Sequence, residues 1–230
     1  MINKTRLTLP ALFYNSVEKF ADNTSVKFAG EEDFTYKQMG EDVELLAELL
    51  VGLGIGKGDK VAILSTNMPN WGKAFFATSV VGAVAVPILP DFHSNEIETI
   101  IEHSESKLLF VSEGLYKSVS PGVSDIVDHM VLVDSFAVIP KETPADHLKK
   151  LTSSVPQAAR KFLPVNVEEE DLASIIYTSG TTGSSKGVML THKNLAWTAK
   201  QSRTLQKITP ADRFISILPL SHTCLLYTSD

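Results

Sequence analysis

The sequence predicts an α/β fold in which helices cover both faces of a mostly parallel sheet. Short apolar runs typical of buried strands occur at 61–65, 84–86 and 107–111. Between them lie longer segments whose apolar residues recur at helical spacing. This alternation favours parallel pairing, because each helix returns the chain to the same edge of the sheet.

The N-terminal part is expected to form two helices joined by a small hairpin. Thr8 can cap the first helix, with Pro10 in its opening turn. The hairpin is predicted over 25–36. A capping box at 35–38 then starts a second helix, whose inward stripe is Met39, Val43, Leu46 and Leu50.

The central part is expected to continue the alternation. A helix over 69–81 separates the first two parallel strands, and Ser94 is predicted to cap the next helix. A short helix near Leu115 leads to a strand at 130–133. The apolar stretch 74–90 is too short for a membrane span, which needs about 20 apolar residues, so a buried helix and strand explain it better.

The pattern weakens over 135–167, which four prolines interrupt. We expect a surface connection there with one or two short helices. The segment carries the basic residues Lys149, Lys150, Arg160 and Lys161. We expect them to form a solvated face, and binding of an anionic partner is the alternative. The acidic segment 168–171 is expected to be a solvated turn.

Composition limits the classes of function. Of the 230 residues, 43% are hydrophobic and 21% charged, which is typical of a globular protein. The net charge of −6 argues against a nucleic-acid partner. The single cysteine, Cys224, fits a reducing compartment, and the first ten residues lack a signal-peptide core. We therefore expect a cytoplasmic protein without a transmembrane helix, and membrane association stays open.

The stretch 172–190 carries the strongest functional signal. An apolar strand is predicted at 172–177 and a second at 188–190. Lys186 is the charged residue of the connection, in which a run of hydroxyl residues and glycines precedes it: Thr178, Ser179, Gly180, Thr181, Thr182, Gly183, Ser184 and Ser185.

Such a connection can cradle phosphate groups. Gly180 and Gly183 let backbone N–H groups point at one anion, and the hydroxyls add donors. Lys186 adds a mobile positive charge, which at about 4 Å and an effective dielectric of about 20 contributes roughly 4 kcal/mol per unit of phosphate charge before desolvation.

Two other interpretations fit this connection less well. A flexible Gly/Ser/Thr linker is seldom enclosed by two apolar strands and closed by one lysine. A Walker loop has glycine before its lysine and Ser or Thr after it, where this chain has Ser185 and Gly187. A Walker loop also opens a helix, whereas 188–190 is predicted to be a strand.

The run from Tyr177 to His192, Tyr-Thr-Ser-Gly-Thr-Thr-Gly-Ser-Ser-Lys-Gly-Val-Met-Leu-Thr-His, resembles the phosphate-loop signature of the AMP-forming acyl-CoA synthetase family. The resemblance covers the chain to about Thr223 and implies the front part of that family's large N-terminal domain, here incomplete. Ser185 departs from the family, which usually has proline there. Loss of a compatible proline costs about 0.4–1 kcal/mol through unfolded-chain entropy.

The resemblance implies a two-step reaction. A carboxylate attacks the α-phosphorus of ATP to give acyl-AMP and pyrophosphate, and coenzyme A then takes the acyl group. The resemblance assigns ATP binding to residues 178–186, with Lys186 as the catalytic group that neutralises phosphate charge. Mg²⁺ is expected on the phosphate oxygens. The six histidines show no close metal-binding spacing, so no protein metal ligand is predicted, and the expected partners are small molecules rather than proteins.

The resemblance also bears on the acyl group. His222 ends a Pro-Leu-Ser-His element that resembles the family's histidine beside the acyl and nucleotide pocket; a loop histidine without a role is the alternative. Thr181 resembles acyl-CoA synthetases, since peptide-synthetase domains more often have Ser there, and the sequence of 218–223 resembles the long-chain fatty acyl members most. A long-chain fatty acid is therefore the expected substrate, with peripheral membrane contact to collect it, and another acyl, aryl or amino acid is the alternative.

The last elements and the domain plan complete the prediction. A helix capped by Thr191 is expected to bury Trp197, and 214–218 is expected to be a strand. The incomplete domain, 1–230, divides into the alternating region, the connection, the phosphate-loop region and a tail unlike the family: 1–134, 135–167, 168–223 and 224–230.

The family's later adenine and ribose motifs do not occur in the chain. This chain alone is therefore expected to be inactive. Two functions of other classes stay open, an ATP-binding module without catalysis and a non-functional fragment.

Overall fold

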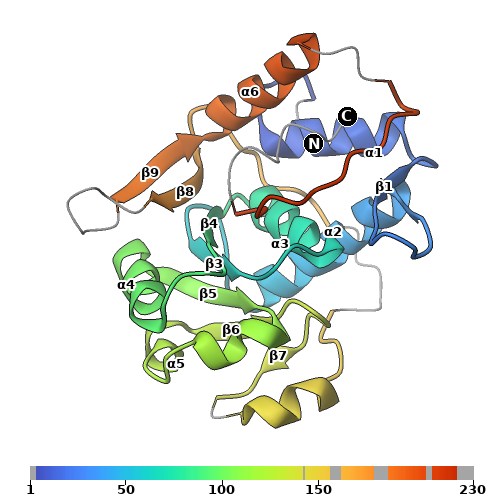
Figure 1. Ribbon diagram of the computed structural model, residues 1–230. Coiled ribbons are helices and arrows are strands. Elements are labelled where there is room, and N and C mark those ends of the chain that lie inside the picture. The colour runs from blue at the N-terminus through green and yellow to red at the C-terminus, as the bar shows by residue number, and fades with distance from the viewer. Residues whose placement is uncertain (1–3, 142, 156–161, 179–185, 206–208, 222–230) are drawn as a thin grey trace.

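The computed structural model describes residues 4–141, 143–155, 162–178, 186–205 and 209–221 (Figure 1). In chain order the elements are α1 (Leu9–Lys19), β1 (Thr24–Val26), β2 (Phe34–Thr35), α2 (Tyr36–Gly52), β3 (Lys60–Leu64), α3 (Pro69–Val80), β4 (Val84–Ile88), α4 (Ser94–Ser104), β5 (Ser106–Val111), the 3₁₀ helix η1 (Glu113–Ser118), α5 (Val123–Ile126), β6 (His129–Leu132), β7 (Val138–Ile139), the 3₁₀ helix η2 (Ala145–Lys150), β8 (Leu172–Thr178), β9 (Lys186–Thr191) and α6 (His192–Leu205).

The main sheet has the strand order β7-β6-β5-β3-β4-β8-β9. Pairing is parallel from β6 through β8 and antiparallel at each end, where β7 joins β6 and β9 joins β8. β1 and β2 form a separate antiparallel pair. The mostly parallel α/β sheet predicted from the sequence is therefore confirmed.

Helices cover both faces of the sheet, as the sequence predicted. On one face α1, α2 and α3 pack against Val61, Ile63 and Phe110. On the other face α4 and α5 pack against Leu64 and Val86 among others. Strand residues alternate between the two clusters because successive side chains point to opposite faces of a sheet.

Local signals explain where several elements begin and end. Thr35 caps α2, where its Oγ1 accepts from Gln38 N at 3.2 Å while Thr35 N donates to Gln38 Oε1 at 2.8 Å. Gly82 ends α3 with φ of 75°, a left-handed conformation that glycine adopts at little cost. No helix among the described residues is long and apolar enough to cross a membrane.

Two details of the connections differ from the prediction. α4 begins at Ser94, so its N-cap is His93, whose N–H donates to Glu96 Oε2 at 2.9 Å. The segment 135–167 contains the predicted short helix, η2, but also the unpredicted strand β7. Phe136, Ile139 and Leu148 are buried, so this segment contributes to the core and is more than a surface connection.

Two expectations for the C-terminal part were wrong. Trp197 is 52% exposed, because Leu195 and Ala196 form the buried face of α6. Residues 214–218 form no strand in the described part of the chain. Asn67 instead holds the end of this segment by two hydrogen bonds. Its Nδ2 donates to Leu218 O at 2.7 Å, and its Oδ1 accepts from Leu220 N at 2.9 Å.

Candidate phosphate-binding hairpin

β8 and β9 form an antiparallel hairpin at one edge of the main sheet (Figure 1). Ser174 fixes the hairpin to the sheet: it pairs with Ala85 of β4, and its Oγ donates to Ala85 O at 2.9 Å. The predicted phosphate loop begins at the carboxyl end of β8, where ligands commonly bind in open α/β sheets.

Thr178 and Lys186 are register partners at the end of this hairpin. Both are exposed, and Lys186 forms no ion pair with a described residue. The two ends of the predicted loop therefore lie side by side, with a cationic side chain free for an anionic ligand. Residues 179–185 and His222 lie outside the described residues, so their predicted roles stay predictions.

The end of β8 is tied to α4. The Tyr177 hydroxyl lies 2.6 Å from His103 Nδ1, and burial raises the pKa of this tyrosine. His103 is exposed in the last turn of α4, whereas Tyr177 is buried. Sequence reasoning missed this pair because its members are 74 positions apart and belong to different elements.

The root of the hairpin is fixed by the turn 168–171, which is more than the solvated turn expected from its charges. Asp171 O accepts from His192 N at 3.0 Å, and Glu169 O accepts from Lys193 N at 2.8 Å. The Glu169 carboxylate also accepts from Leu7 N at 2.9 Å. The acidic side chains therefore bind the N-terminal segment as well as facing solvent.

Asp171 and His192 lie together in this root. Burial tends to raise the pKa of Asp171, but the hydrogen bond from Glu168 N and the Lys57 ammonium at 2.6 Å outweigh it and lower the pKa. Burial lowers the pKa of His192 to about 4, against the attraction of Asp171. His192 is therefore neutral near pH 7, and it serves the structure of the root rather than carrying charge.

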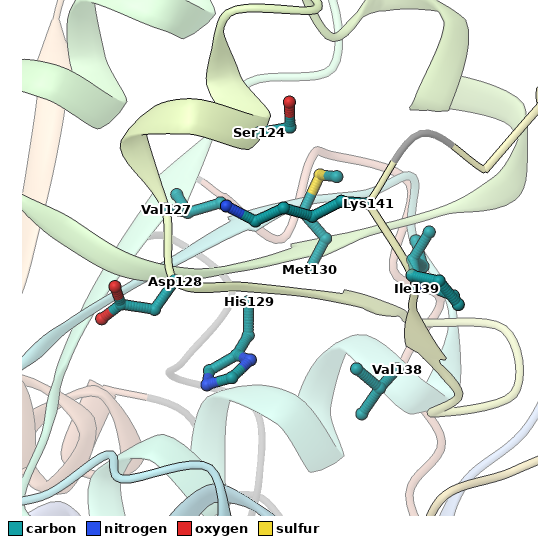
Figure 2. Close-up of a pocket in the computed structure, with 9 residues that line it drawn as sticks. Ser124, Val127, Asp128, His129, Met130, Val138, Ile139 and Lys141 are labelled. Atoms are coloured by element: carbon teal, nitrogen blue, oxygen red, sulfur yellow. The ribbon is translucent and has the colours of Figure 1, made fainter.

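A cavity of about 190 Å³ lies between α5 and the strands β6 and β7 (Figure 2). It is at the opposite end of the strand order from the β8–β9 hairpin. Figure 2 shows the side chains of Asp128 and His129 pointing in different directions and Lys141 reaching across toward Val127. These polar groups do not converge on one point, so the cavity lacks the arrangement of a catalytic site.

Mg²⁺ has no protein cage in the described part of the chain. These residues include no group of three or more His, Cys, Asp or Glu side chains placed to hold a metal ion. The exposed Lys186 and Thr178 supply a cation and a hydroxyl, which suit phosphate oxygens. The end of the hairpin thus presents groups whose chemistry suits an anionic ligand.

A family model described as AMP-binding enzyme matches residues 13–228. The chain belongs to this family. Curated relatives of the chain include the crotonobetaine/carnitine–CoA ligases of Salmonella paratyphi A, 29% identical over 214 residues, and Citrobacter koseri, 27% identical over 212 residues. Each match covers 89% of this chain and 40% of the relative, so the chain spans less than half the length of these relatives.

Solved structures of other proteins share the fold. The inhibitor-bound N-terminal domain of FACL13 from Mycobacterium tuberculosis has a TM-score of 0.77 and 26% identity, over 96% of this chain and 54% of that one. The long-chain-fatty-acid–CoA ligase FadD1 of Archaeoglobus fulgidus has a TM-score of 0.76 and 27% identity, over 94% and 42%. The chain therefore has the fold of the front part of the N-terminal domain of adenylate-forming enzymes, as the sequence predicted.

Proposed function

We propose that the protein to which this chain belongs activates a carboxylic acid with ATP and passes the acyl group to coenzyme A. The observation that carries the proposal is the Thr178–Lys186 pair, which presents a cation without an ion-pair partner among the described residues at the end of β8. Membership of the AMP-binding family supports it, and so do relatives that are CoA ligases.

In this proposal the residues 178–186 hold the β- and γ-phosphates of ATP. The site must bring two anions together, the carboxylate and the triphosphate, so it has to neutralise charge and hold the attack in line. Lys186 reduces the repulsion at the phosphates, and pyrophosphate becomes a stabilised leaving group. Mg²⁺ enters with the nucleotide, since it prefers phosphate oxygens and water to an all-protein cage.

We further propose a long-chain fatty acid as the acyl substrate, with His222 beside the acyl pocket. The sequence of 218–223 and the likeness to FadD1 support a fatty-acid substrate. A short polar acid is the second candidate, because the relatives from Salmonella paratyphi A and Citrobacter koseri are named crotonobetaine/carnitine–CoA ligases. Peripheral membrane contact stays a prediction, which co-sedimentation with phosphatidylcholine vesicles would test.

The experiment is exchange of labelled pyrophosphate into ATP by the complete protein. Palmitate, acetate, carnitine, benzoate and an amino acid are each supplied in turn. Exchange that depends on palmitate supports both the reaction and the substrate. Exchange with another acid supports the reaction and contradicts the substrate, and exchange with none of a broader acid panel contradicts the reaction and favours an ATP-binding module.

A further inference from the structure

The hydrogen bond between Tyr177 and His103 links the candidate site to α4. The hydroxyl and Nδ1 lie 2.6 Å apart, and the rings meet edge to face with centroids 5.7 Å apart. Tyr177 immediately precedes Thr178, so the bond acts one residue from the Thr178–Lys186 pair. The His103–Tyr177 hydrogen bond is therefore close enough to affect the orientation of Thr178 and Lys186.

Gly187 gives the Tyr177 ring its place between the two strands. Gly187 is the register partner of Tyr177. A Cβ added to Gly187 would lie 2.9 Å from Ile175 Cγ2 and 3.2 Å from Tyr177 Cζ, both too close for an unshifted side chain. The ring thus packs against the backbone that follows Lys186, while its hydroxyl is held by His103. One side chain fixes both strands where Thr178 and Lys186 project.

We propose that His103 is a positioning residue for nucleotide binding, acting through Tyr177 on the Thr178–Lys186 pair. The inference rests on the proposed function, because it assigns a role toward the same phosphates. Misplacing a binding group by about 1 Å can cost on the order of 100-fold in rate. Loss of one neutral hydrogen bond should cost less, about three- to tenfold in the half-saturating MgATP concentration.

A purely structural role for the pair would have a different consequence. In that case its removal lowers the melting temperature and leaves the nucleotide constant unchanged. The chain offers a matched control, since the Tyr116 hydroxyl donates to Thr143 O at 3.0 Å in the η1–η2 region, at the other end of the sheet. Tyr116→Phe removes a comparable tyrosine hydrogen bond away from the hairpin.

The test measures pyrophosphate exchange by the complete protein as a function of MgATP and of acid, for the wild type and four variants. Tyr177→Phe and His103→Ala should raise the half-saturating MgATP concentration about three- to tenfold. Their constant for the acid should stay within about twofold. His103→Asn should restore the wild-type value, because an amide can occupy the position of Nδ1. Tyr116→Phe should leave the MgATP constant unchanged.

The outcomes separate the inference from the proposed function. Wild-type exchange with unchanged MgATP constants in both Tyr177→Phe and His103→Ala overturns the positioning role alone. Equal increases in the MgATP and acid constants overturn it too, since a general loss of structure explains them. No wild-type exchange with any acid overturns both. His103 is exposed, so its truncation should leave the core intact, and Tyr177→Phe removes only one oxygen.

Discussion

The backbone N–H of Leu9 donates to Nδ1 of His192 at 3.4 Å, which joins the start of α1 to the start of α6. The two residues are 183 positions apart. Because Nδ1 accepts this bond, the imidazole proton lies on Nε2, which is buried without a partner among the described residues. A neutral histidine is therefore part of the junction at the root of the hairpin.

This junction predicts a loss of stability in mild acid. The folded-state pKa of His192, about 4, is below its ordinary value of 6.5, so the unfolded chain takes up the proton first as pH falls. The stability that neutral His192 gives the folded chain is fully present above pH 6.5 and is lost as the pH falls from 6.5 to 4. It should lower the free energy of unfolding by about 2 kcal/mol at pH 5, as measured by urea denaturation.

His192→Asn is the control for this pH dependence. Its Oδ1 can accept from Leu9 N, but the side chain does not titrate. The variant should lose less stability than the wild type between pH 7.5 and 5. Asp59 and Asp171 have pKa values lowered from 3.8, so their contributions are lost below this window. Equal losses of unfolding free energy in the wild type and His192→Asn would mean that His192 does not cause the pH dependence.

Gly187 predicts a packing effect. Gly187→Ala places a Cβ against Ile175 and Tyr177, so it should destabilise the chain by about 1–3 kcal/mol through overpacking. Gly114→Ala is the matched control, because a Cβ there would meet no atom within 4 Å. Thermal denaturation of both variants measures the difference. Similar melting temperatures for the two would mean that the ring does not occupy the space over Gly187.

The exposed side of β9 predicts self-association of this 230-residue chain. β9 lies at the edge of the sheet, and Val188 and Met189 are 45% and 67% exposed. An apolar edge strand can pair with a second copy, and a lysine on it opposes that pairing. Met189→Lys should therefore shift the chain toward monomer in light scattering. Unchanged self-association of Met189→Lys would mean that the copies associate through a surface other than β9.

Local patterns made much of the fold predictable. The Thr35 capping box fixed the start of α2, and the apolar runs at β3, β4 and β5 indicated strands buried on both faces. The apolar runs on either side of the predicted phosphate loop likewise indicated β8 and β9, while the phosphate site itself stays a prediction. Each of these signals is contained within about twenty residues, so periodicity and turn chemistry are enough to detect it.

The errors arose where tertiary contacts decide. β7 has two residues, too few to show a period, and it exists because it pairs with β6. Trp197 was assigned to the core by its chemistry, but smaller neighbours occupy the buried face of α6. The His103–Tyr177 bond joins α4 to β8 and has no local signature. The network around 168–171 depends likewise on the N-terminal segment.

The proposed reaction depends most on Lys186, the residue proposed to hold the phosphates of ATP. In the complete protein, Lys186→Ala should weaken MgATP binding or slow adenylation by about one to three powers of ten, because it removes one electrostatic contact. Transfer from preformed acyl-AMP to coenzyme A should suffer less, since no triphosphate takes part. Lys193→Ala is the control, because Lys193 is an exposed lysine 2.9 Å from Glu170 and should affect neither step.

The most direct measurement compares the two half-reactions in Lys186→Ala by rapid quench, with acyl-AMP formed from ATP in one series and supplied in the other. Adenylation should fall by at least about tenfold, while acyl transfer should stay within about threefold of the wild type. Equal loss in both half-reactions, or loss in neither, would contradict this expectation and would mean that Lys186 does not bind the phosphates.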